Sequence, residues 1–282
     1  MSLALVLNSS NLSNTNTKSE FTYNFIQGAL DIAKDSTMTI AGITMPYSFF
    51  NVTSQYANQR FNIIFPTFAG FTTLQITIPA GFYTVTDINN YLTTQFISNN
   101  LYLLDAGGNY ITYVSLLYNV SSYAVQLNCF AVPTALPAGY TNPGGMTFPV
   151  VATTPQFFIP AISTLNVLLG LNNNQNYPTV VQATNFSQLS TTTPVGSNIN
   201  NIIVRCNLID NNCSMPSDVL GSFPINAEFG SNINYEPAFE IKLKVKQGRY
   251  DKMVLNFTDQ NFNTINSQDA NVLITLLLNL GK

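Results

Sequence analysis

The amino-acid sequence predicts an all-β protein of the β-sandwich or jelly-roll class, with a second β-rich lobe. Three observations lead to this prediction. Apolar and polar residues alternate through most of the chain, only one segment has helical spacing, and long loops separate the strands. A jelly roll needs about eight strands. Because more segments than that alternate, we expect an insertion between the early and the late strands.

The alternating segments give the predicted strands in order. The clearest example is Phe21, Tyr23 and Phe25, which alternate with Thr22 and Asn24. A hairpin is predicted at Asn119-Val120, between two such segments. The last three segments follow one another through short connections, which predicts antiparallel neighbours. The predicted strands span residues 20–27, 36–44, 60–65, 71–79, 109–118, 122–130, 199–209, 237–246, 249–259 and 269–280.

One segment, residues 86–99, has helical rather than strand spacing. Ile88, Leu92 and Phe96 recur every four residues, which predicts a helix of about three turns. Thr86 is its expected N-cap, and Asp87 would interact favourably with the helix dipole. Residues 131–160 contain six prolines and three glycines and are predicted to form a long irregular loop.

The composition favours a protein that is buried in an assembly. Only 8% of the 282 residues are charged and 46% are hydrophobic, against about 25% charged in an average domain. A surface of neutral amides and hydroxyls costs less to desolvate than a charged one. An AT-rich genome would also enrich Asn, Ile, Tyr and Phe, so composition alone leaves both explanations open.

Several classes of chemistry are disfavoured. The chain has no histidine, which removes the commonest general base and metal ligand. Cys129, Cys206 and Cys213 form no zinc-site spacing, and we expect buried free thiols in a reducing compartment. No segment has the length of a membrane-spanning helix or the features of a signal peptide. We therefore predict no catalytic residue, no cofactor and no metal site.

Five of the ten basic residues lie close together near the C-terminus: Lys242, Lys244, Lys246, Arg249 and Lys252. On a strand over 239–246, Lys242, Lys244 and Lys246 would share one face. A solvated face that discourages edge-to-edge aggregation is the preferred interpretation. The alternative is an electrostatic contact with an acidic neighbour or with packaged nucleic acid. Nucleic acid is a disfavoured partner, because the net charge is −3.

Two tyrosines in the long loops, Tyr140 and Tyr177, are candidate contact aromatics. The remaining aromatic residues are expected in the core. The acidic residues are scattered, and no pair is predicted to converge as a catalytic pair would.

Several segments, in a consistent order, resemble the penton (minor capsid) proteins of virophages and Polinton-like viruses, in the adenovirus-like double-jelly-roll lineage. They are residues 21–25, 40–51 (IAGITMPYSFFN), 78–84 (IPAGFYT) leading into 87–89, 168–171 (LLGL) before Tyr177-Pro178, and 257–261 (FTDQN).

The resemblance implies a single jelly roll with an inserted outer domain. The expected division is residues 1–60 and 196–282 for the jelly roll and 61–195 for the insertion. It further implies a homopentamer that closes each fivefold vertex of an icosahedral virion and contacts the major capsid protein. Other minor capsid proteins or a host receptor are further candidate partners. Synthesis and assembly would take place in the host cytoplasm.

Three other functions remain open. The first is a β-sandwich module that binds glycans or a receptor, as a spike or adhesin does. The second is a histidine-free hydrolase with two carboxylates about 5–10 Å apart. The third is a capsid cement or spike protein of the same class of viruses.

Overall fold

The computed structural model describes residues 2–14, 18–26 and 28–281, and the chain forms two compact units. Unit 1 comprises residues 1–50 and 199–282, and unit 2 comprises residues 51–198. Unit 2 is thus inserted into the sequence of unit 1. The boundaries expected from the sequence, after residues 60 and 195, lie within ten residues of these.

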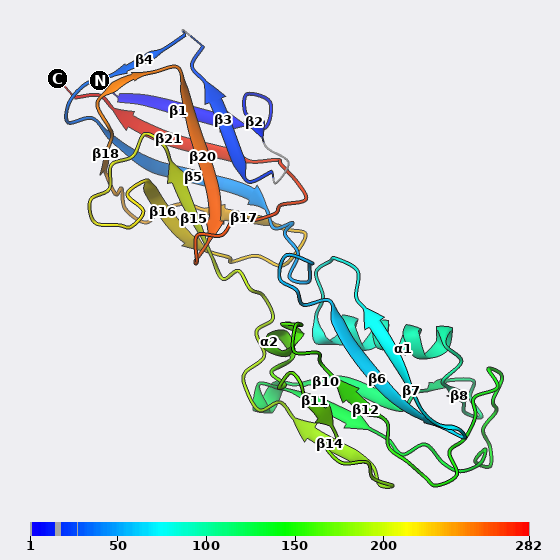
Figure 1. The fold of residues 1–282 in the computed structure, drawn as a ribbon. Helices are drawn as coiled ribbons and strands as arrows, with labels where there is room; N and C mark the ends of the chain where they lie inside the picture. Colours follow the sequence, from blue (N-terminus) through cyan, green and yellow to red (C-terminus); the bar gives the residue numbers. More distant parts are fainter. Residues whose placement is uncertain (1, 15–17, 27, 282) are drawn as a thin grey trace. The chain divides into compact units, whose positions relative to one another are not determined.

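The first sheet of unit 1 has the strand order β1 (Ser2–Asn8), β21 (Leu273–Asn279), β5 (Thr37–Pro46), with all pairs antiparallel. The other edge of β5 is shared by two short strands. β17 (Asn232–Tyr235) pairs with residues 43–46, and β18 (Leu243–Lys244) pairs with residues 37–38. Long β5 is therefore the centre of this sheet (Figure 1).

The second sheet of unit 1 is also antiparallel. Its order is β16 (Val219–Pro224), β15 (Asn201–Cys206), β20 (Lys252–Asp259), β3 (Glu20–Asn24) and β2 (Ser13–Asn14). A separate two-stranded ladder joins β4 (Leu30–Ile32) to β19 (Gly248–Tyr250).

The order of pairing identifies unit 1 as a jelly roll. Counted along the chain, its eight principal strands are β1, β3, β5, β15, β16, the β17–β18 pair counted as one strand, β20 and β21. The first pairs with the eighth, the second with the seventh, the third with the sixth and the fourth with the fifth. This nested pairing divides eight strands between two sheets, as in a jelly roll. The predicted all-β fold is confirmed.

The alternation within each strand explains why two sheets form a core between them. In β21, Ile274, Leu276 and Leu278 are fully buried, whereas the residues between them are partly exposed. In the second sheet, Phe21 of β3 packs edge-to-face on Phe257 of β20, with ring centroids 5.8 Å apart. Successive side chains of a strand point to opposite faces, so each sheet presents one apolar face.

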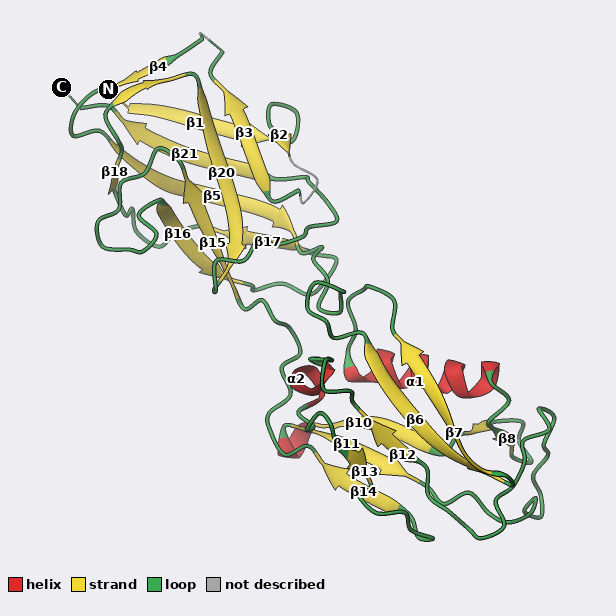
Figure 2. Ribbon diagram, viewed as in Figure 1, coloured by secondary structure: helices red, strands yellow, loops and turns green. Residues whose placement is uncertain are grey.

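Unit 2 contains two further antiparallel sheets and the helices (Figure 2). One sheet has the order β13 (Asn176–Tyr177), β12 (Gln156–Phe158), β6 (Arg60–Thr67), β7 (Gly70–Thr77). The other sheet has the order β10 (Val114–Asn119), β11 (Ala124–Cys129), β14 (Phe186–Leu189). The predicted hairpin at Asn119-Val120 is confirmed.

The smaller elements of unit 2 are short. β8 (Leu103–Leu104) pairs with β9 (Tyr110–Ile111), and the 3-10 turn η1 (Val120–Ser122) joins β10 to β11. Helix α2 (Leu165–Leu169) ends at Gly170.

The predicted helix is α1 (Val85–Ser98), but its N-cap is Thr84 rather than Thr86. The Thr84 hydroxyl accepts a hydrogen bond from the Asp87 N–H, and the Asp87 carboxylate accepts one from the Thr84 N–H. This reciprocal capping box satisfies two donors at once and explains why the helix begins two residues earlier than expected.

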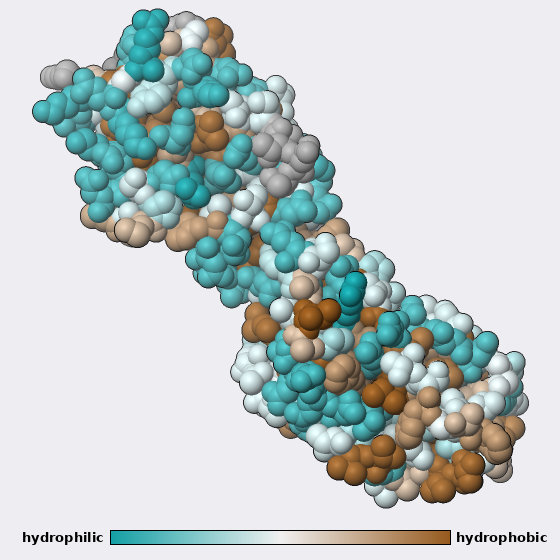
Figure 3. All heavy atoms as spheres, viewed as in Figure 1, coloured by the Kyte–Doolittle hydropathy of each residue, from teal (hydrophilic) through white to brown (hydrophobic). Residues whose placement is uncertain are grey.

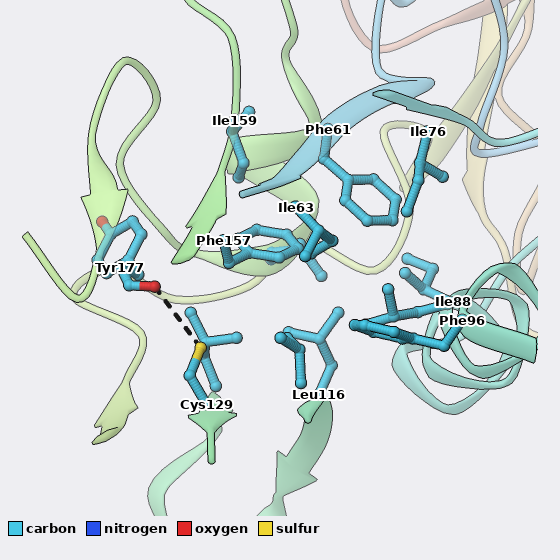
Figure 4. Packing of buried hydrophobic residues seen from close by; sticks show 14 of the residues in the cluster. Phe61, Ile63, Ile76, Ile88, Phe96, Leu116, Cys129, Phe157, Ile159 and Tyr177 are labelled. Atoms are coloured by element: carbon cyan, nitrogen blue, oxygen red, sulfur yellow. Dashed lines mark hydrogen bonds between the residues drawn. The ribbon is translucent and has the colours of Figure 1, made fainter. Parts of the chain in front are cut away.

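Helix α1 buries Ile88, Leu92 and Phe96 in the core of unit 2. Figure 4 shows Ile88 and Phe96 directed toward side chains from β6, β7 and β10. On the strand side, Phe157 stacks on Phe61 with ring centroids 5.2 Å apart. Unit 2 thus has a hydrophobic core of its own.

Two predictions about the C-terminal strands are wrong. Residues 237–246 do not form one strand, because only Leu243–Lys244 pairs with β5. The last strands are not neighbours either. β20 pairs with β15 and β3, whereas β21 pairs with β5 and β1, in the other sheet. In a jelly roll, consecutive strands commonly alternate between sheets, so closeness in sequence does not give pairing.

Candidate interaction surfaces

The charged residues are divided unequally between the two units. Unit 2 contains only Arg60, Asp87 and Asp105, and none of its residues from 106 to 198 is charged. The other twenty charged residues of the chain belong to unit 1. Nearly the whole surface of unit 2 therefore consists of apolar groups, amides and hydroxyls.

Unit 2 also exposes many large apolar side chains, and Figure 3 shows hydrophobic residues gathered in patches on it. Several lie on three loops: Phe130 and Leu136, Val150 and Val151, and Val180 and Val181. Val150 and Val180 are each 71% exposed. We call these six residues the loop patch. Contiguous exposed apolar surface commonly marks a site of interaction.

The three loops of the loop patch are joined by hydrogen bonds. The Thr154 N–H donates to the Gln182 carbonyl at 2.8 Å, and the Thr154 hydroxyl donates to the Thr184 carbonyl at 2.6 Å. The Ala131 N–H donates to the Asn185 side chain at 2.9 Å. These bonds hold the loops together, so the exposed valines belong to one connected region.

A second feature of unit 2 is a pocket of about 460 Å³ at the N-terminal end of α1. Phe82 to Thr86 form one wall, and Leu168 and residues 194–197 contribute another. Tyr118 and Tyr123, at the ends of the β10–β11 connection, complete the lining. We call this the tyrosine pocket.

The walls of the tyrosine pocket are tied together by the buried side chain of Asn51. Its Nδ2 donates to the carbonyls of Tyr83 and Gly196, each at 2.8 Å. Its Oδ1 accepts from the Tyr83 N–H, also at 2.8 Å. Asn51 thereby joins two segments that are more than 100 residues apart in the sequence.

In unit 1, exposed apolar residues lie beside the edges of the two sheets. Phe239 is 73% exposed and Ile241 is 55% exposed, immediately before β18. Ile241 lines a cavity of about 220 Å³ together with Ile40 of β5 and Leu220 of β16. This cavity lies between β5 and β16, the edge strand of the second sheet. We call Phe239 and Ile241 the edge pair.

The basic residues do not form the expected strand face. Lys242 precedes β18, Lys244 is within it and Lys246 follows it, while Arg249 is on β19 and Lys252 begins β20. The Lys242 Nζ lies 3.7 Å from the Glu240 carboxylate, and Arg249 lies 4.0 Å from Asp31. Lys246 donates to the Asn207 carbonyl at 3.3 Å. Such exposed ion pairs contribute little stability.

One of the two candidate tyrosines is not at the surface. Tyr177 is fully buried in the core of unit 2, and its hydroxyl accepts a hydrogen bond from the Asn172 N–H at 2.8 Å. The expectation of a surface role for Tyr177 is therefore corrected. Tyr140 is partly buried and packs against the same core. The exposed pair Tyr118 and Tyr123 was missed, because both lie in a segment assigned only to a hairpin.

Two carboxylates of unit 1, Asp218 and Asp259, have structural contacts. Asp218 forms a bidentate ion pair with Arg205, with N–O distances of 2.9 and 2.8 Å. Asp259 accepts from the N–H groups of Asn261 and Asn263, each at 2.8 Å, and so shapes the loop after β20.

Among the described residues, no cluster of three or more His, Cys, Asp or Glu could hold a metal ion. Nor is any described helix long and apolar enough to cross a membrane.

The three cysteines are free thiols, but only two are buried as expected. Cys129 and Cys206 are buried, and burial raises the pKa of each to about 12. Cys213 is exposed in the loop between β15 and β16. The thiolate is the nucleophile, so the two buried thiols are unreactive for two reasons: reagents cannot reach them, and the raised pKa keeps them protonated.

We expect one thiol per native chain to react with an aromatic disulfide reagent at pH 8, and three after unfolding. Cys213→Ser should abolish the reaction of the native protein and leave two reactive thiols after unfolding. The measurement is absorbance titration with and without denaturant. Rapid reaction of two or three native thiols would contradict the described burial.

Comparison with known proteins gives structural matches only. No family model matches the chain, and no curated protein matches its sequence. The mavirus penton protein matches with a TM-score of 0.45 and 10% identity, over 99% of this chain and 100% of that one. A chain of the Sputnik virophage matches with a TM-score of 0.37 and 11% identity, over 98% and 97%. The first is a penton protein, and the second comes from a virophage.

Proposed function

We propose that this chain is a structural subunit of a viral capsid, and that five copies form the penton capsomer closing each fivefold vertex. The observation that carries the proposal is the nested strand order of unit 1, with unit 2 inserted between its third and fourth principal strands. A jelly roll is a common architecture of viral capsid proteins. The ordered sequence resemblance to penton proteins supports the same role.

Fivefold closure requires two different surfaces on each subunit. A cyclic interface of this kind is heterologous, so one side of a subunit must complement the other side of the next. The edge pair is our candidate for one of these surfaces, because both side chains are apolar and exposed and Ile241 lines the cavity beside the edge strand β16. The nearly uncharged surface of unit 2 would cost less to desolvate against neighbouring subunits or the major capsid protein than a charged surface would.

The primary test is the mass of the purified protein by light scattering, with negative-stain images of the particles. A mass of five chains and fivefold rings is the expected result. If the protein is a monomer, it is mixed with the major capsid protein of the same virus, and incorporation at vertices is the expected result. A stable dimer or tetramer, or a monomer that never enters capsids, would overturn the proposal.

Changing the edge pair tests the candidate contact. We expect Phe239→Asp to convert pentamers into monomers at micromolar concentration, because the neighbour would have to bury a carboxylate. Phe239→Leu keeps an apolar side chain and should keep the pentamer. Both variants should keep the fold and the melting temperature of the jelly roll, since Phe239 is largely exposed. A Phe239→Asp protein that still forms rings would remove the edge pair from the interface.

The salt dependence of the ring distinguishes apolar from electrostatic contacts. Salt screens the interaction between exposed charges that are farther apart than the Debye length, which is roughly 10 Å at 0.1 M salt and shortens as salt is added. We expect the pentamer to persist between 0.05 and about 0.5 M salt. Dissociation over that range would instead assign the contact to Lys242, Lys244, Lys246, Arg249 and Lys252.

A further inference from the structure

We infer that the tyrosine pocket of unit 2 binds an uncharged saccharide. The inference concerns ligand recognition and is independent of the proposed pentamer. It depends on the lining of the pocket, on the absence of charge at its surface, on the two tyrosines at the β10–β11 connection and on the fixed position of its walls.

The lining combines apolar faces with hydroxyl groups. Phe82, Val85, Leu168 and Pro194 supply apolar surface, while Thr86 and Ser197 carry hydroxyls. A sugar ring has the same two characters, because its C–H groups form apolar patches and its hydroxyls form a polar edge. A volume of about 460 Å³ lies within the range of small-molecule sites, about 300–1,000 Å³.

Electrostatics select a neutral ligand. None of the lining residues is charged at neutral pH. An anion would ordinarily be attracted to the N-terminus of a helix, but the Asp87 carboxylate already occupies that position on α1 through the capping box. Partial burial, together with Tyr91 and Asp87, raises the pKa of Tyr83, so its phenol stays neutral. A cation would find no carboxylate in the lining.

The tyrosines offer a surface for stacking. The rings of Tyr118 and Tyr123 are edge-to-face, with centroids 6.1 Å apart, and both are substantially exposed. Tyr123 has a left-handed backbone conformation, with φ 47° and ψ 48°. That conformation is unfavourable for a bulky residue and is found preferentially at functional positions.

The pocket is held in place without a ligand. Asn51 fixes Tyr83 and Gly196 by three hydrogen bonds of 2.8 Å each. The Val195 N–H donates to the Val167 carbonyl at 3.1 Å, which attaches the 194–197 segment to α2. A preformed site does not have to be ordered by its ligand, which favours binding.

The test uses the full chain and saturation-transfer NMR with defined probes. The probes are neutral oligosaccharides ending in galactose, glucose, mannose or N-acetylglucosamine, and the same oligosaccharides carrying sialic acid or sulfate. A proline-rich peptide is included, because aromatic grooves also bind such segments. The expected result is binding of at least one neutral probe, weaker binding of its charged derivative and no binding of the peptide.

Two variants place the binding in the tyrosine pocket. Tyr123→Asn removes the ring but keeps a residue that tolerates the left-handed conformation, and binding should fall about tenfold or more. Gly196→Leu should block the pocket, since a Cβ at Gly196 meets no atom within 4 Å and the backbone there is not left-handed.

The matched control is Tyr110→Ala. Tyr110 forms a similar edge-to-face pair with Tyr102, at 5.1 Å, but does not line the pocket. Its loss should leave binding unchanged. The inference is overturned if no neutral probe binds at about 10 mM, a concentration above the dissociation constant expected of a functional site. It is also overturned if Gly196→Leu binds normally, or if the peptide or only charged sugars bind.

Discussion

Replacing Phe157 with alanine is expected to lower the free energy of unfolding of unit 2 by about 3–5 kcal/mol. Phe157 is fully buried and stacks on Phe61, so its loss removes apolar contacts and leaves a cavity. Because unit 2 has its own core, we expect unit 1 to keep its stability. Hydrogen exchange measured on peptides from both units would report the change in each.

The matched control is Phe257→Ala in the jelly roll, where Phe257 is fully buried against Phe21. This variant should accelerate exchange in unit 1 and spare the core strands of unit 2. If either variant accelerated exchange equally throughout the chain, the two cores would be one cooperative unit, and the division into two stabilities would be wrong.

Gly170→Ala is expected to destabilise unit 2 by more than about 2 kcal/mol, because a conformational cost and a steric clash add. Gly170 ends α2 with φ 67°, a conformation that costs about 1–2 kcal/mol for a residue with a side chain. A Cβ there would also lie 2.2 Å from the Thr192 carbonyl oxygen, so backbone must move. The Thr192 N–H donates to the Gly170 carbonyl at 3.1 Å, and this bond would be disturbed. Chemical denaturation followed on unit 2 measures the loss.

Gly145→Ala separates the two causes. Gly145 has a similar φ of 69°, but a Cβ there meets nothing within 4 Å. Only the conformational cost should appear, about 1–2 kcal/mol. Because Thr192 is two residues before Pro194 of the tyrosine pocket, Gly170→Ala should also weaken saccharide binding. Equal losses of stability in the two variants would show that the close approach at Gly170 relaxes easily.

Local pattern was sufficient to predict most individual elements. β21 and α1 were found because their apolar residues repeat at periods of two and nearly four over at least seven residues. The apolar face of a helix or strand depends only on the spacing of its own apolar residues, so it can be recognised in the sequence. The all-β class followed from the same information.

Pairing between strands was not visible, because it depends on residues far apart in the chain. Phe239 and Ile241 continue the alternation of residues 237–246, yet the edge of β5 is divided between β17 and β18. Alternation of apolar and polar residues does not show whether the backbone of a segment forms hydrogen bonds with a neighbouring strand. Similarly, β1 was not predicted, and it is a strand because β21 pairs with it along its whole length.

Of the candidate sites, the sequence identified residue types rather than positions. Tyr177 was expected on the surface because it lies in a long loop, but its side chain is fully buried. Its carbonyl lies 3.5 Å from the Cys129 thiol (Figure 4). The tyrosine pocket joins residues 82–86, Tyr118, Tyr123, Leu168, Pro194 and residues 196–197. No local spacing connects these segments. Asn51 was likewise unremarkable until its three hydrogen bonds were known.

The scarcity of charge on unit 2 has a kinetic consequence. Oppositely charged surfaces attract each other over a distance and raise association rates toward 10⁸–10⁹ M⁻¹ s⁻¹, whereas neutral surfaces associate at about 10⁵–10⁶ M⁻¹ s⁻¹. With only Arg60, Asp87 and Asp105 in 148 residues, unit 2 has almost no long-range field. Partners that bind this chain through unit 2 therefore associate without electrostatic steering, and the protein distinguishes among them mainly by the dissociation rate of each complex.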